Sequence, residues 1–235
     1  MKGILLTLGF MLLAVPLLAG CALIGGNVVT REEAFTGFDK VDVSHAFQVD
    51  ISQGDTFSVV IRIDDNLVQY LEVVKEGNTL KIGLKPGWEP IQPRTEEAKI
   101  TMPELTGLIL SGACRGTITG FKSAEDLSLS VSGASSLQGD IEAGDASFSA
   151  SGSSKVTLNG SAQDVMIEAL GSSEVNLGSF LVNDANVKAI GDSDVTVKPS
   201  GKLDANASGA SHVYYLDNPT LGKIDTSGDS SVERK

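Results

Sequence analysis

Apolar side chains in the second half of the chain recur at every second residue, and the whole pattern repeats about every 20 residues. Each repeat has a glycine, with mostly apolar residues two and four positions before it and four positions after it, and a serine or cysteine two positions after it. All these columns lie an even number of residues from the glycine, so they share one face of an extended chain and predict strands. The glycines are Gly112, Gly133, Gly152, Gly171, Gly191, Gly209 and Gly228.

Self-similarity at this period is typical of a solenoid, in which each repeat adds one coil to a stack. We predict an all-β fold, a parallel β-helix or β-solenoid with about 19–20 residues per repeat and a spacing of about 4.8 Å between coils. The glycines are expected to form a structural column at a tight inward corner. The serines are expected to pass hydroxyl hydrogen bonds along their own column.

The first half of the chain is also rich in strands, but it is broader and less regular. Alternating apolar residues over 41–51 predict an earlier, wider coil in which His45 takes the place of the corner glycine. Strands over 67–74 and 80–84 flank a hairpin turn at 76–78.

Polar residues three positions after each glycine are expected to face solvent. This column includes Lys155, Glu174, Asp194 and His212, and the first two are expected one coil apart. An exposed ion pair of this kind contributes about 0–1 kcal/mol. The column therefore supports solubility and protects the strand edges rather than driving folding.

The N-terminus has the features of a secretory signal: Lys2, an apolar stretch over 4–18, and small residues before Cys21. Residues 18–21, Leu-Ala-Gly-Cys, resemble a bacterial lipobox, which implies a diacylglycerol on Cys21 and removal of everything before it. The alternative is an ordinary signal peptide with an incidental cysteine. We divide the chain into a lipoprotein signal peptide (1–20), a short linker (21–34) and a single domain (35–235).

With Cys21 acylated, Cys114 is the only other cysteine, so no disulfide within the chain is expected. Cys114 stands in the serine column, where a small buried thiol substitutes sterically. The formal net charge of −12 excludes nucleic acid as a partner and disfavours anionic lipid, which leaves the acyl group as the membrane attachment.

No convergent set of catalytic or metal-binding residues is evident, and we predict no enzyme activity and no cofactor. Gly112 to Gly116 fits a nucleophile-elbow pattern with Cys114 as nucleophile, but the other repeats carry the same motif and no strand-to-helix turn follows. The two histidines fall in different coils. Acidic runs at 64–66 and 192–194 lack the ligand count of a calcium loop.

Three aromatic residues are candidate ligand contacts. Trp88 lies in the proline-rich loop over 85–93, where it either contacts a ligand or folds over the side of the solenoid. His212 and Tyr214 are expected side by side on the outer face of one late coil.

Several motifs together resemble one known family: the lipobox, residues 38–43, 49–55 and 80–84, and the Ser-Gly-Ala-Ser coils. From about residue 35 onward the chain is similar to the putative auto-transporter adhesin, head GIN domain family. This resemblance implies a right-handed β-helical fold outside the bacterial cell, often as a lipoprotein, and it brings no catalytic residues. His45 departs from the small residue expected at its corner. Envelope-stress accessory proteins share a related coil pattern.

The leading hypothesis is a lipid-anchored binding or adhesion module of the cell envelope that presents a rigid solenoid face to a protein or glycan. The protein is expected to be exported, and the sequence does not decide between the periplasmic side and the cell surface. One alternative is a carbohydrate-active enzyme acting on envelope or extracellular polysaccharide. Another is an accessory protein of envelope-stress signalling. Exposed strand edges at the solenoid ends also allow a homo-oligomer.

Overall fold

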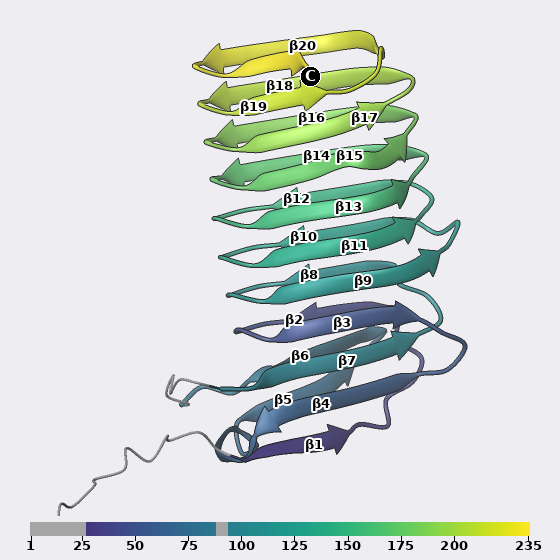
Figure 1. Cartoon of the computed structure of the whole chain (residues 1–235), viewed down its shortest axis with the longest axis vertical. Coiled ribbons are helices and arrows are strands. Elements are labelled where there is room, and N and C mark those ends of the chain that lie inside the picture. The colour runs from purple at the N-terminus through teal and green to yellow at the C-terminus, as the bar shows by residue number, and fades with distance from the viewer. Residues whose placement is uncertain (1–26, 88–93) are drawn as a thin grey trace, which may run out of the picture.

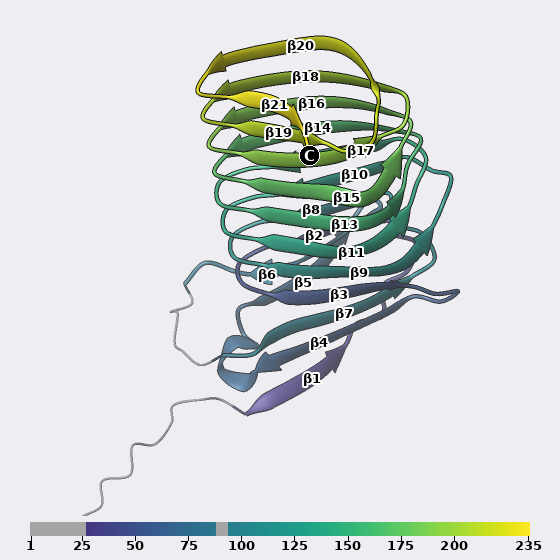
Figure 2. The same cartoon turned by 45° about the horizontal axis from the view of Figure 1, so that its top comes forward.

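The computed structural model describes residues 27–87 and 94–235, and these residues form two facing β-sheets wound into one solenoid (Figure 1). The predicted all-β solenoid is confirmed. The chain passes from one sheet to the other and back in each coil, and successive coils stack along one axis (Figure 2). The one helical element in the described ranges is the 3-10 turn η1 (Asp65–Leu67). Among those residues, no helix is long and apolar enough to cross a membrane.

We call the 11-stranded sheet A and the 10-stranded sheet B. In spatial order, sheet A contains β1 (Val28–Glu32), β4 (Ser58–Asp64), β7 (Glu96–Met102), β3 (Gln48–Gln53), β9 (Arg115–Lys122), β11 (Ser136–Glu142), β13 (Lys155–Ser161), β15 (Glu174–Val182), β17 (Asp194–Pro199), β19 (His212–Tyr215) and β21 (Ser231–Arg234). In the opposite spatial order, sheet B contains β20 (Thr220–Gly228), β18 (Lys202–Gly209), β16 (Asp184–Gly191), β14 (Asp164–Gly171), β12 (Ala146–Ala150), β10 (Leu127–Val131), β8 (Gly107–Leu110), β2 (Lys40–Val43), β6 (Thr79–Leu84) and β5 (Leu71–Glu76).

The N-terminal coils do not stack in chain order. The coil of β2 and β3 lies between the coil of β6 and β7 and the coil of β8 and β9, and all these neighbours pair in parallel. Antiparallel pairs β1–β4, β4–β7 and β5–β6 complete this end. The hairpin predicted at 76–78 is confirmed, although its first strand begins at Leu71 and not at residue 67. Strand β1 lies inside the segment 21–34, so part of the expected linker belongs to sheet A.

A left-handed backbone conformation marks each repeat corner. The seven column glycines have φ between 74° and 96°, a region that favours glycine. A Cβ on each would lie under 3.0 Å from a carbonyl oxygen of the preceding coil. His45 occupies the same corner in its coil, with φ of 75°, and its carbonyl lies under Gly112. The glycines are exposed or half-buried, so the expected inward position is wrong: the corner turns them outward.

The serines that follow the corners are buried, except Ser230 in the last coil, which is half-buried, and they do not form the expected serine-to-serine chain. In the five later coils the hydroxyl donates instead to the backbone carbonyl two residues before the glycine of the preceding coil, which ties coil to coil and satisfies the hydroxyl donor. The hydroxyl oxygen of Ser135 accepts a hydrogen bond from the Cys114 N–H at 3.1 Å. These bonds run from Ser154 to Val131, from Ser173 to Ala150, from Ser193 to Ala169, from Ser211 to Ala189 and from Ser230 to Ala207, with Oγ···O distances of 2.9–3.3 Å.

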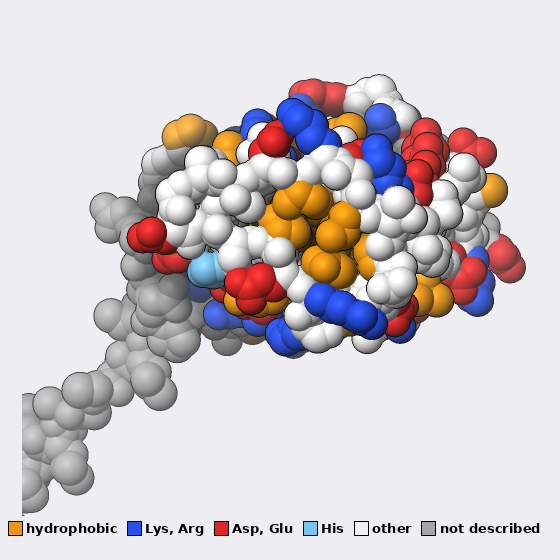
Figure 3. Space-filling view, turned by 90° about the horizontal axis from the view of Figure 1, so that it is seen from above, with side chains coloured by type: hydrophobic (Ala, Val, Ile, Leu, Met, Phe, Trp, Pro, Cys, Tyr) orange, Lys and Arg blue, Asp and Glu red, His pale blue; other side chains and the backbone are white. Residues whose placement is uncertain are grey.

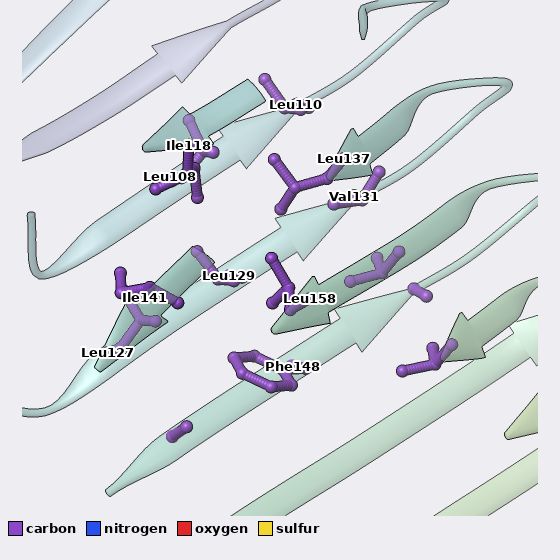
Figure 4. Close-up of a cluster of buried hydrophobic side chains, with 14 of the residues drawn as sticks. Leu108, Leu110, Ile118, Leu127, Leu129, Val131, Leu137, Ile141, Phe148 and Leu158 are labelled. Carbon is purple, nitrogen blue, oxygen red and sulfur yellow. The ribbon is translucent and has the colours of Figure 1, made fainter. Parts of the chain in front are cut away.

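The core fills the space between the two sheets with the side chains predicted by the alternating pattern (Figure 4). Leu129 of sheet B and Leu137 and Leu158 of sheet A are examples, each at most 2% exposed. Phe148 and Phe180 meet edge to face with ring centroids 5.7 Å apart. Each such buried side chain contributes about 1.5–3 kcal/mol, so burial between the sheets, rather than surface ion pairs, stabilises the stack.

Candidate functional site

The outer face of sheet A carries the polar column expected from the sequence. Lys155 pairs in register with Glu174, and Lys155 Nζ lies 2.7 Å from Glu174 Oε2. The column continues in register through Asp194 to His212. The prediction that Lys155 and Glu174 lie one coil apart is therefore confirmed. Both side chains are about half exposed, so this pair contributes little to stability.

His212 and Tyr214 lie side by side on β19, near the C-terminal end of sheet A. Their rings stack with centroids 6.2 Å apart. His212 Nδ1 lies 2.9 Å from Ser231 Oγ, and Lys235 Nζ lies 5.1 Å from the centroid of the Tyr214 ring. Residues of the next coil therefore already contact both rings. A ligand would meet a half-buried aromatic pair and not a free ring face.

Two predicted site residues lie outside the described residues. They are Cys21, the expected lipidation site, and Trp88, the candidate contact residue in the proline-rich loop. Both remain predictions from the sequence.

The cysteine in the nucleophile-elbow motif is part of the corner architecture. Cys114 is fully buried, and its thiol donates to the Ser111 carbonyl at 3.2 Å and lies 3.7 Å from the Val43 carbonyl. The Val43 contact matches the position that the serines use in later coils. Burial raises the pKa of Cys114 to about 11, so the thiol stays protonated at neutral pH, where it is a poor nucleophile.

The two histidines lie far apart in the stack, His45 at the corner between β2 and β3 and His212 in β19. The Leu84 N–H donates to His45 Nδ1 at 3.2 Å, so this nitrogen is the acceptor. Burial, with the positive charge of Arg94, lowers the pKa of His45, which keeps the ring neutral. Within the described ranges, no group of three or more His, Cys, Asp or Glu side chains is placed to hold a metal ion.

A groove lies on the outer face of sheet B, a surface that the sequence analysis did not single out. Its volume is about 700 Å³, and it runs across the coils from β2 to β18. Its lining combines buried and exposed residues of the same strands. The lining residues are Lys40, Thr106, Asp126, Leu127, Ser128, Asp145, Ala146, Ser147, Asp164, Val165, Met166, Asp184, Ala185, Asn186, Lys202 and Asp204.

A column of four aspartates lines the groove. Oδ1 of each aspartate accepts a hydrogen bond from the backbone N–H of the equivalent residue in the next coil, with N···O distances of 3.1, 3.3, 3.0 and 2.7 Å. The acceptors are Asp126, Asp145, Asp164 and Asp184, and the last donor is Lys202. These bonds fix the carboxylates at the coil spacing of about 4.8 Å. In the described chain, no residue donates a hydrogen bond to Oδ2 of these four aspartates.

The sequence does contain a signal for this column. Each of the four aspartates stands seven residues before a column glycine, at Gly133, Gly152, Gly171 and Gly191. An odd offset places them off the apolar face, so a search for apolar columns passes over them. Met166, which is 60% exposed, gives the middle of the groove an apolar surface beside the carboxylates.

The two facing sheets and the repeated corners define a β-solenoid protein. The chain belongs to the putative auto-transporter adhesin, head GIN domain family, whose sequence model matches residues 37–219. This membership, expected from the motifs, is confirmed. It indicates an extracellular or envelope-associated protein.

Solved structures share the architecture. A putative adhesin from Bacteroides fragilis superposes with a TM-score of 0.82 at 19% identity, covering 89% of this chain and 97% of its own. A putative adhesin from Parabacteroides merdae gives 0.68 at 17% identity, covering 89% and 98%. A protein described as a putative lipid binding protein from Parabacteroides distasonis gives 0.66 at 21% identity, covering 90% and 98%. At these identities the likeness establishes the fold alone. A search of the curated proteins found no match.

Proposed function

We propose that this protein is a non-catalytic, lipid-anchored binding module of the cell envelope that holds an extended glycan in the groove on sheet B. The observation that carries the proposal is the groove itself, whose lining includes an aspartate acceptor in each of four successive coils. A solenoid face with a repeated acceptor suits a polymer with repeated donors, because each unit of the ligand meets the same chemistry.

The aspartate column supplies that chemistry. Oδ1 of Asp145 is held by the backbone of the next coil, so the carboxylate is positioned before a ligand arrives. Oδ2 is available to accept from a sugar hydroxyl, and hydrogen bonds to an ionised acceptor are stronger than neutral ones. The same negative charges oppose an anionic glycan, so the ligand class is a neutral or amino-substituted sugar polymer.

Two further features support a binding role over catalysis. Cys114, the one described thiol, is buried and kept protonated. The polar column on the outer face of sheet A contains the exposed Lys155–Glu174 ion pair and lies away from the groove. The membrane tether rests on the lipobox residues before Cys21.

Binding of purified full-length protein to an array of neutral, amino-substituted and anionic glycans tests the ligand, followed by calorimetry on the best binder. Asp145→Asn and Asp164→Asn keep an acceptor for the backbone bond but remove the charge, and each is expected to weaken binding about tenfold. Asp192→Asn, at an exposed corner outside the groove, is the matched control and should bind like the native protein. Equal binding by all three variants would place the ligand elsewhere.

Membrane fractionation tests the tether separately. Cys21→Ser is expected to move the protein from the membrane fraction to the soluble fraction. Continued sedimentation with membranes would refute lipid anchoring at Cys21 without bearing on the groove. Hydrolysis of envelope polysaccharide that is lost in a Lys155, Glu174 or Asp194 variant would overturn the non-catalytic assignment.

A further inference from the structure

The C-terminal end of the solenoid exposes two unpaired strand edges and an apolar centre. Strand β20 is the last strand of sheet B, and β21 is the last strand of sheet A. Eight of the nine residues of β20 are exposed, and Leu221 is 48% exposed. Seen along the axis, hydrophobic side chains gather in the middle of this end with charged residues around them (Figure 3). Ile224 and Val232 are only partly buried against the core here.

Backbone groups at this end point away from the stack. In β21, the N–H groups of Ser231 and Lys235 donate to β19 and its neighbouring residues below, so the N–H and C=O of Val232 point outward. In β20, the Lys223 N–H donates down to Asp204 and the Asp229 N–H, just past the strand, donates down to Gly209. By the same alternation, the N–H and C=O of Ile224 point outward. Such an edge is a template for another strand.

Ile224 is the middle residue of β20. Its outward N–H and C=O allow a second strand to pair with β20 around it. We propose that this end binds the same end of a second copy of the chain, with β20 antiparallel to β20 of the partner subunit about a two-fold axis at Ile224 that runs perpendicular to sheet B. Sheet B then continues into the partner.

Charge complementarity favours a second copy as the occupant. With Ile224 on the axis, Lys223 lies opposite Asp225 of the partner subunit, and Asp225 lies opposite the partner's Lys223. Within one copy, Lys223 and Asp225 form an exposed ion pair at 2.7 Å. Dimer formation therefore gives each of these side chains a second opposite charge, from the partner subunit. The end is also electrically balanced: residues 220–235 contain Lys223, Arg234 and Lys235 against Asp225, Asp229 and Glu233. The whole chain carries −12, so this end avoids the repulsion that the rest of the surface would produce.

The symmetry also limits the assembly to two copies. A two-fold axis uses the same surface on both partners, so the contact closes and no filament grows. The N-terminal strands β1 and β5 then lie at the two far ends of the dimer (Figure 1). This pairing does not depend on the proposed glycan site, which lies on the side of the stack.

Analytical ultracentrifugation of the full-length protein over a concentration series tests the dimer. We expect a reversible monomer–dimer equilibrium. Lys223→Asp places like charges opposite each other and should weaken dimerisation about tenfold, and Lys223→Asp combined with Asp225→Lys should restore it. Both residues are exposed, so we expect the substitutions to leave the fold intact. Unchanged thermal unfolding of each variant checks this. A monomer at every concentration, or growth beyond a dimer, would overturn the proposal.

Engineered cysteines test the register. Opposed residues in an antiparallel pair have Cα atoms about 4.5–5.5 Å apart, within disulfide range. Lys223→Cys and Asp225→Cys proteins, mixed under oxidising conditions, should form a heterodimeric disulfide that peptide mapping locates at 223–225. Each protein alone should form that link poorly, since 223 does not face 223. Equal yields from the mixture and from each protein alone would contradict the axis through Ile224.

Discussion

The carbonyl oxygen of Gly152 lies 2.9 Å from the position that a Cβ atom would occupy on Gly171, one coil later. The same relationship recurs from corner to corner, and each glycine also has a positive φ. Glycine is therefore required twice at these positions, once for the backbone conformation and once for the close approach of the neighbouring coil. The corner, and not the core, sets how closely two coils stack on this side.

Gly171→Val is expected to lower the free energy of unfolding by about 3 kcal/mol or more, because it combines backbone strain with a backbone clash. Gly120→Val is the matched control: its φ is 79°, but no atom lies within 4 Å of its Cβ position. Chemical denaturation of both variants separates strain from clash. Equal losses of unfolding free energy in Gly171→Val and Gly120→Val would mean that the stacked corner tolerates a side chain.

Much of this fold could be predicted because the apolar columns all lie an even number of residues from the repeat glycine. Apolar residues at even offsets from Gly171 could be assigned to one interior, and the pairing of Lys155 with Glu174 followed from the repeat length. The insertion of the β2–β3 coil between later coils could not be predicted, because pairing between distant segments depends on the whole stack. His45 could be assigned to a corner because its flanking residues follow the repeat, and the structure gives it the same φ as the glycines.

The candidate site was harder to predict than the fold. His212 and Tyr214 were placed together on one strand, as the structure shows, but their contacts with Ser231 and Lys235 depend on the next coil. The groove on sheet B was missed because the polar residues in its lining are mostly aspartates and serines, which also occur in turns. Only the repetition of aspartate at one offset distinguishes Asp145 and Asp164 from ordinary surface residues.

Ser173→Ala should lower the free energy of unfolding by about 1–3 kcal/mol. The substitution leaves the buried Ala150 carbonyl without the hydroxyl that lies 3.3 Å away. Ser172→Ala, at the exposed neighbouring position, is the control and should change stability by less than about 0.5 kcal/mol. Urea denaturation followed by circular dichroism measures both. A neutral Ser173→Ala would show that the serine ladder is not needed for stability.

The buried thiol of Cys114 should make stability depend on pH in the alkaline range. Its pKa is raised from 9.0 to about 11 in the folded protein, so the unfolded chain loses this proton first as the pH rises. The contribution of the protonated thiol to the free energy of unfolding is fully present below pH 9. It declines as the pH rises toward 11, by about 1.4 kcal/mol per pH unit. Native protein should also protect Cys114 from alkylation.

Cys114→Ser removes this titration while keeping a small donor at the position. The stability of the native protein relative to Cys114→Ser should therefore fall by about 1 kcal/mol between about pH 8 and about pH 10. Equilibrium denaturation of both proteins at the two pH values gives the difference, and other titrating groups cancel in the comparison. A constant difference would indicate that the thiol ionises equally well in the folded state.

The two-fold pairing at Ile224, combined with the proposed tether at Cys21, predicts adhesion between membranes. The paired ends lie away from the N-terminal strands, so a dimer would bridge two surfaces rather than join neighbours on one. Vesicles carrying full-length acylated protein should aggregate, as measured by turbidity, and Lys223→Asp vesicles should not. Vesicles with Lys223→Asp mixed with vesicles carrying Asp225→Lys should aggregate again, because each Asp then faces a Lys across the axis. Dimerisation in solution without aggregation of native vesicles would show that the paired end does not reach across two membranes.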